Sequence, residues 1–188
     1  MGRIRYGFKN LYYATATISS GTMTYGTPVA IPGAKSMNLS PAGDTISENA
    51  DDTRWFTMYG NTGYEGTIEF EDTSEADTFL KTVLGQTADT KGVVWEKASD
   101  TPSEFALFGQ FTLAGGTETG KRVCFVRCVA SRPTVEGATK EDSVDVATNT
   151  VNIVALPRIE DDVIKALCDS TSTGYTTFFS AVPTIATT

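Results

Sequence analysis

Apolar and polar residues alternate with a period of two along most of the chain, and turns rich in glycine, threonine and proline separate the alternating stretches. In residues 67–71, Ile68 and Phe70 fall on one face, while Thr67, Glu69 and Glu71 fall on the other. Because side chains of a strand point alternately to its two faces, this pattern predicts a strand with one apolar and one polar face.

Four further stretches predict strands by alternation or by their content of β-branched and aromatic residues. They are residues 92–97, 104–113, 121–130 and 143–156. Pro157 ends the last one. The second and third are separated by the glycine-rich residues 114–120, so they predict one hairpin.

Residues 73–85 predict the main helix. Thr73 or Ser74 can cap its first turn, acidic residues follow there, and Gly85 can end it. The apolar residues that recur at helical spacing, and so predict the face that docks on a sheet, are Ala76, Phe79 and Val83.

Two shorter stretches near the C-terminus are less regular. Residues 176–181 predict a second short helix that presents Phe178 and Phe179, whereas residues 163–168 fit a strand or a helix by periodicity alone. Few helices and many short strands indicate a mainly β protein, a β-sandwich or barrel with one flanking α-helix. No linker or repeat divides the chain, so we expect a single domain over residues 1–188.

Residues 32–64 are polar and interrupted by glycine and proline, and they predict a long loop. Loops of that length in a compact domain are usually functional or disordered. Four aromatic residues lie in it, of the kind that fill protein interfaces: Trp55, Phe56, Tyr59 and Tyr64. Packing back on their own domain is the equal alternative.

Composition narrows the function. The chain has 188 residues and a net charge of −8, which argues against a protein that grips nucleic acid by its phosphates. It has no histidine, the commonest general base and metal ligand, so an enzyme is not expected. It has no apolar run of the roughly 20 residues that cross a bilayer. The first residues include two arginines but no apolar stretch, so a secretory signal is not expected there.

The three cysteines are expected to be reduced thiols that pack in the core. Cys124 and Cys128 are four residues apart on a predicted strand, so they should face the same way, about 13 Å apart along it. That separation is too long for a disulfide.

Three groups of polar residues are candidate sites, and none of them predicts a cofactor or a metal ion. Residues 115–121 match the start of a phosphate-binding loop, but Arg122 stands where a hydroxyl should bind magnesium, and a strand follows instead of a helix. The acidic runs lack the spacing of a calcium loop. Basic residues concentrate at Lys121, Arg122, Arg127 and Arg132, and we expect Arg122 and Arg127 to meet an acidic patch on a neighbouring subunit.

Several strings together resemble the major tail (tail tube) proteins of long-tailed bacteriophages. In the first half they are residues 6–13, 49–52 (Asn-Ala-Asp-Asp), Trp55-Phe56, 64–70 and the helix end at Leu84-Gly85. In the second half they are residues 151–158, with a Pro-Arg turn, residues 162–166 and the aromatic ending at 174–179. One departure is Asp161-Asp162, where the family pattern has Asp-Gly before the last strand.

This resemblance implies a β-sandwich or barrel with a flanking helix, six copies to a ring, and rings stacked into a tube through which genome DNA passes without specific binding. It implies a virion protein, assembled in the host bacterial cytoplasm, that partners with itself and with tape measure, tail terminator and distal tail proteins. It favours a strand at 163–168, and it gives the 32–64 loop and the terminal arms the contacts between rings. Glu69 and Glu71 become candidates for the lumen wall. A β-rich adhesion or capsid-decoration domain is the alternative from a different class.

Overall fold

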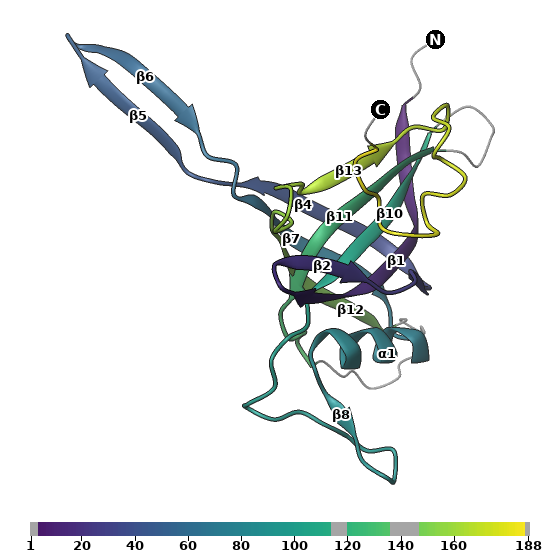
Figure 1. Ribbon diagram of the computed structural model, residues 1–188. Coiled ribbons are helices and arrows are strands. Elements are labelled where there is room, and N and C mark those ends of the chain that lie inside the picture. Colours follow the sequence, from purple (N-terminus) through teal and green to yellow (C-terminus); the bar gives the residue numbers. More distant parts are fainter. Residues whose placement is uncertain (1–3, 114–119, 136–146, 187–188) are drawn as a thin grey trace, which may run out of the picture.

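The computed structural model of the chain describes residues 4–113, 120–135 and 147–186 (Figure 1). Within these residues nine strands form one sheet in which neighbours run antiparallel. Its main path is β2 (Thr22–Tyr25), β1 (Arg5–Ser19), β10 (Phe105–Leu113), β11 (Gly120–Ala130), β12 (Thr148–Ala155), β7 (Gly63–Glu71) and β4 (Ala34–Ala42). In addition, β3 (Val29–Ile31) pairs with β1, and β13 (Lys165–Cys168) pairs with β11.

The sheet rolls into a barrel, and helix α1 (Ser74–Val83) lies across one end of it (Figure 1). Phe79 of α1 enters the barrel interior, where its ring contacts those of Tyr13, Phe70 and Phe105 at centroid distances of 4.9, 5.7 and 5.6 Å. Thr73 caps the helix by accepting a hydrogen bond from the Ala76 amide at 3.1 Å. The mainly β fold, the helix and its buried face were all predicted correctly.

A second apolar cluster lies on the outer face of β1, β10 and β11. There Ala106, Phe108 and Val126 are covered by Phe178 and other residues of the C-terminal segment (residues 169–186). The central strands are therefore buried on both faces. The family resemblance implied that terminal arms, without stated bounds, connect the rings; this C-terminal segment packs on the barrel of its own chain.

The short helix expected over residues 176–181 is wrong. The segment forms successive turns, in which the amides of Phe178 and Ser180 donate to the carbonyl oxygens of Tyr175 and Thr177. It is short and contains β-branched threonines, and both properties disfavour a helix. The expectation of a strand near residues 163–168 is confirmed as β13.

The long loop expected over residues 32–64 is also wrong, because most of it is strand. β4 pairs with β7 from Ala34–Phe70 to Ala42–Gly63, and β5 (Thr45–Ala50) and β6 (Thr53–Tyr59) form a separate hairpin. The polar residues that suggested a loop lie on an exposed strand face, and Pro41 is tolerated because β4 ends the sheet.

The other strand boundaries agree in part. The hairpin of β10 and β11 is confirmed, although its expected glycine-rich tip at residues 114–119 lies outside the described residues. Of the strand expected at 92–97, only β9 (Val94–Trp95) forms, paired with β8 (Thr87–Ala88). The strand expected at 143–156 is β12, and residues 143–146 of that prediction lie outside the described residues.

Cys124 and Cys128 face opposite sides of the sheet, contrary to expectation. Phe105 pairs with Cys128 but Leu107 pairs with Phe125, so β11 holds one extra residue at a bulge between them. Cys128 consequently joins the barrel interior, whereas Cys124 joins the outer cluster. Both remain free, buried thiols, as predicted for core packing.

Candidate interaction surfaces

The β5–β6 hairpin projects away from the barrel (Figure 1). Its large apolar side chains are exposed, with Trp55 74% and Tyr59 78% accessible, and Ile46, Phe56 and Met58 about half accessible. Ile46 pairs with Met58 on one face of the hairpin, and the neighbouring Tyr59 points to the other. Both faces of the hairpin therefore present apolar groups to solvent.

Glycines join this hairpin to the barrel. Gly43 has a φ of +142°, and a Cβ placed there would lie 2.1 Å from the carbonyl oxygen of Gly60. The Gly60 amide donates to the Asp44 carbonyl at 2.9 Å, so the backbones touch at this point. Only glycine fits position 43, and the β4–β7 pair continues through it into the hairpin.

The tip of the hairpin is a two-residue turn. Asp51 and Asp52 both have positive φ, 50° and 56°, and Ala50 pairs with Thr53 on either side of them. Two consecutive left-handed residues are the geometry of a type I′ turn, whose twist matches that of the flanking strands. The tip therefore carries two adjacent carboxylates.

Tyr64 lies apart from the other three aromatic residues predicted as contacts. Its ring meets Phe125 edge-on at 5.3 Å, and the ammonium of Lys165 lies 4.3 Å from the ring centroid and donates to the Tyr64 hydroxyl. Tyr64 thus packs on its own barrel, while Trp55, Phe56 and Tyr59 stay exposed.

Glu69 and Glu71 lie on the outer, polar face of β7, opposite the buried Ile68 and Phe70. The Ser36 hydroxyl of β4 donates to the Glu69 carboxylate at 2.8 Å. The face also includes outward residues of β4, β7 and β12, namely Ser36, Asn38, Ser40, Glu65, Thr67, Thr148, Thr150 and Asn152. We call it the polar face, and Glu65 is a member that sequence reasoning missed.

Arg127 makes an ion pair inside the chain. Its Nε and one NH2 nitrogen donate to the two carboxylate oxygens of Glu104 at 2.9 and 2.7 Å, and its other nitrogen donates to the Pro157 carbonyl at 3.2 Å. The hydrogen bonds that Arg127 donates to Glu104 raise the pKa of Arg127. A bidentate pair of this kind holds the guanidinium in a fixed orientation.

Arg122 fastens the C-terminal segment to the barrel. Its guanidinium lies 3.9 Å from the ring centroid of Tyr175 and 4.4 Å from that of Phe179. It also donates to the Tyr175 carbonyl and, at 3.2 Å, to the side-chain oxygen of Gln110. The predicted inter-subunit role of Arg122 and Arg127 stays a prediction, since the contacts seen for both lie within the chain.

Arg158 is a buried arginine whose role sequence reasoning did not identify. It is 3% exposed, forms a bidentate pair with Asp161 at 2.8 and 2.5 Å, and donates to the Pro183 carbonyl at 3.2 Å. The hydrogen bond from Arg158 lowers the pKa of Asp161. The following Asp162 has a φ of 57°, the conformation that glycine adopts most easily, at the position where the family pattern has glycine.

The β8–β9 hairpin is a second projecting element that sequence reasoning did not single out (Figure 1). Trp95 is 54% exposed, and its indole N–H donates to Asp89 at 3.1 Å. The other Asp89 oxygen accepts from the amides of Lys91 and Val93 at 2.8 and 2.9 Å. The hydrogen bond from Trp95 is the largest cause of a lowered pKa at Asp89, whose carboxylate organises the turn.

Chemistry-bearing groups do not gather into a reactive site in the part of the chain that the structure describes. Burial raises the pKa of Cys124 and Cys128, which keeps both as unreactive thiols. No cluster of three metal-ligating side chains occurs among the described residues. Their one helix, ten residues long, is too short to cross a membrane.

No family model and no curated protein sequence matches the chain. Among solved structures, it is similar to a chain of the cryo-EM structure of the anti-feeding prophage (AFP) baseplate, 6-fold symmetrised, with a TM-score of 0.51, 10% identity, and 88% of this chain and 94% of that chain covered. This similarity shows a shared fold.

Two further similarities are weaker. One is to the PVC sheath/tube terminator in extended state of an extracellular contractile injection system, with a TM-score of 0.45, 12% identity, and 85% of this chain and 93% of that chain covered. The other is to the anti-feeding prophage cap (AFP tube terminating cap), with a TM-score of 0.49, 11% identity, and coverage of 89% and 94%. At these scores they do not add to the evidence for the fold.

Proposed function

We propose that the chain is a structural subunit of a phage tail, and that six copies form a ring and rings stack into a tail tube that conducts genome DNA. The partners are further copies of the chain and the tail proteins that begin, measure and end the tube. The chain acts in this role by assembly, with no catalytic step.

The observation that carries the proposal is the β5–β6 hairpin. A two-stranded hairpin that stands alone in water is at best marginally stable. This one exposes Trp55, Phe56 and Tyr59 and has no layer of the barrel behind it. Large exposed apolar patches on folded proteins mark sites of protein contact, so the hairpin is a contact element for another subunit.

The fold also supports assembly into a ring. The AFP baseplate structure that shares this fold is a six-fold symmetrised assembly, and the shared fold extends over most of both chains. A chain of this architecture with an unpaired projecting element fits a ring-forming subunit.

The charge of the polar face supports the proposal that the tube conducts DNA. Glu65, Glu69 and Glu71 give this face three carboxylates. One lysine, Lys35 of β4, lies beside them and donates to Thr148 at 2.5 Å, so the carboxylates outnumber it. A wall of net negative charge repels DNA phosphates and keeps the duplex from adhering as it passes. We therefore place the polar face toward the lumen.

Electron microscopy of the purified protein tests the tube. We expect six-fold rings or tubes from the wild type. A variant with Trp55→Ser, Phe56→Ser and Tyr59→Ser should remain folded but monomeric, while a control with two exposed apolar residues outside the hairpin replaced, Val135→Ser and Ile185→Ser, should still assemble. Wild-type protein that stays monomeric at high concentration would refute the proposal.

The polar face is tested in phage particles. Replacing Glu69 and Glu71 by lysine should leave tube length unchanged and slow DNA ejection, and replacement by glutamine should give a smaller delay, because it removes charge without reversing it. Normal ejection kinetics in the lysine variant would contradict the proposal that this face lines the lumen.

A β-rich adhesion or decoration domain is the competing function. It would use the same exposed hairpin to bind a different surface, so purified protein would remain monomeric and bind whole capsids or cells. The microscopy experiment separates the two functions.

A further inference from the structure

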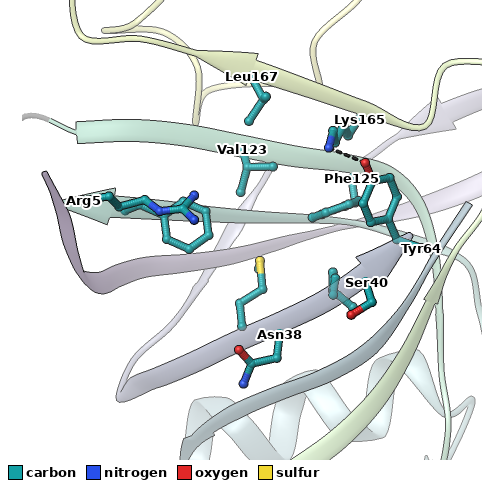
Figure 2. A pocket seen from close by; sticks show the side chains of 11 residues that line it. Arg5, Asn38, Ser40, Tyr64, Val123, Phe125, Lys165 and Leu167 are labelled. Carbon is teal, nitrogen blue, oxygen red and sulfur yellow. Dashed lines mark hydrogen bonds between the residues drawn. The ribbon is translucent and has the colours of Figure 1, made fainter. Parts of the chain in front are cut away.

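The barrel has a groove where its sheet divides. One edge of β11 pairs with β13 over Arg122–Phe125 and with β12 over Cys128–Ala130, so the strands beyond these two partners diverge. Between β13 and β4 lies a groove of about 390 Å³ (Figure 2). Its apolar lining is formed by Met37, Leu39, Phe111, Val123, Phe125 and Leu167.

The strands that border this groove have free edges. β4 is the last strand of the sheet path, and β13 pairs only with β11 among the described strands. Free strand edges offer unpaired backbone N–H and C=O groups, which can pair with a strand of another chain. The groove therefore combines an apolar lining with polar backbone on two sides.

The charge of the groove is opposite to that of the whole chain. Arg5 and Lys165 lie toward its two ends, as Figure 2 shows, and none of its lining residues is acidic. The Arg5 guanidinium lies 4.4 Å over the Phe111 ring, and Lys165 contacts Tyr64. Within the described part of the chain, neither cation has a carboxylate partner.

The β5–β6 hairpin has the complementary chemistry. Residues 44–59 contain four acidic side chains and one arginine, and Asp51 and Asp52 form the exposed tip. Trp55 and Phe56 stand a few residues from these carboxylates and are exposed. The hairpin of the same chain points away from the barrel, so only another molecule can bring one to the groove (Figure 1).

We propose that this groove is the seat of the β5–β6 hairpin of a second copy of the chain. The aromatic side chains near the tip enter the apolar lining, and the tip carboxylates pair with Arg5 and Lys165. This inference rests on the proposed function, because it names the surface on which one tube subunit holds the next.

Charge reversal and its compensation test the pairing. The double variant Arg5→Glu/Lys165→Glu and the double variant Asp51→Lys/Asp52→Lys should each lower tube yield at least tenfold when alone. When the two variants are mixed, tubes should form again. The acidic groove of one variant can then pair with the lysine tip of the other, and the unchanged groove can pair with the unchanged tip. The control Lys91→Glu/Lys97→Glu changes charge by the same amount on the β8–β9 side and should assemble normally. Circular dichroism and melting confirm that each variant is folded.

Cross-linking tests the contact directly. Ser40→Cys lies at the groove and Asn49→Cys on the hairpin, at an exposed position outside its aromatic residues, and the native cysteines are buried. When the two single variants are mixed and oxidised, we expect a disulfide-linked dimer on a non-reducing gel. The pair Ser20→Cys and Asn49→Cys, with an exposed serine in the turn between β1 and β2, should give at least tenfold less dimer.

The outcomes separate the inference from the function. If the wild type forms tubes while charge reversal has no effect and no specific cross-link forms, the groove is not the seat and the tube function stands. If the Arg5→Glu/Lys165→Glu variant still forms tubes but no longer binds another tail protein, the groove binds that protein and not the hairpin, and the inference is overturned. If the wild type forms neither rings nor tubes, the proposed function fails, and the cross-link then reports the groove contact separately.

Discussion

Two halves of the same sheet differ in how their outer faces are used. In β10 every residue from Phe105 to Gln110 is buried, because the barrel interior lies on one face and the C-terminal segment on the other. In β12 buried Val151, Ile153 and Ala155 alternate with exposed residues. The outer face around β10 is buried within the chain and stabilises its fold. The outer face around β12 stays exposed and is free to contact solvent or a partner.

Removal of the C-terminal segment should have the largest effect, because it exposes the outer face that distinguishes the first half from the second. A chain ending at Asp169 loses Tyr175, Phe178 and Val182 and exposes Phe108 to water. At about 1.5–3 kcal/mol for each buried large side chain, the loss is on the order of 5 kcal/mol or more. We expect insoluble or dye-binding protein, measured by solubility and by binding of a hydrophobic fluorophore. A soluble truncated protein with unchanged melting temperature would mean that the segment is not the cover.

Single truncations on the two halves should differ sharply. Phe108→Ala, in the half buried on both faces, should lower the free energy of unfolding by about 3–5 kcal/mol. Thr150→Ala, on the polar face, should change it by less than about 0.5 kcal/mol. Urea denaturation measures both, and similar losses in the two variants would erase the distinction.

Replacing Arg122 should have an intermediate effect on stability, confined to the C-terminal segment. Arg122→Ala removes the stacking on Tyr175 and Phe179 and the hydrogen bond to the Tyr175 carbonyl, a loss of about 1–2 kcal/mol. Arg122→Lys keeps the charge without the planar stack and should recover part of it. Limited proteolysis should cut the C-terminal segment faster in both variants, and an unchanged cleavage rate in the alanine variant would show that Arg122 does not fasten it.

Acid should loosen the same segment by a smaller amount. The pKa of Asp161 is lowered in the folded chain by its hydrogen bond from Arg158, so its stabilising effect is complete above the ordinary aspartate pKa of about 3.9 and is lost as pH falls through the lower folded value. Asp161 is partly exposed, so the effect is small. Melting temperatures from neutral pH to about pH 3 should fall less steeply for Asp161→Asn than for the wild type. Parallel curves would contradict this assignment.

The sequence predicted the parts of the fold whose pattern is set by one buried face. Ile68 and Phe70 on β7 and the α1 face of Ala76, Phe79 and Val83 follow the periods of a strand and a helix, and all are buried. The same method missed β4, β5 and β6. Their outward side chains are polar or exposed, and the Asp51-Asp52 turn lacks the glycine that usually marks a two-residue hairpin.

The candidate surfaces were predicted in part for a related reason. Aromatic residues stand out in a polar stretch, so Trp55, Phe56 and Tyr59 could be proposed as candidate contact residues from the sequence, and all three are exposed. The groove could not be, because Arg5, Met37, Phe111 and Lys165 come together only through pairings between distant strands. Likewise, the bulge that turns Cys124 and Cys128 to opposite faces depends on the register with β10.

The glycine joint at Gly43 and Gly60 has a mechanical consequence. Because the β4–β7 pair continues through it into the hairpin, a pull on the hairpin draws β4 and β7 in the same direction. The pull therefore loads in shear the hydrogen bonds between β7 and its other neighbour, β12, which pair from Tyr64 to Glu71 of β7. Bonds loaded together in shear resist extension better than bonds opened one at a time. Tension on the hairpin is therefore carried by the β7–β12 ladder.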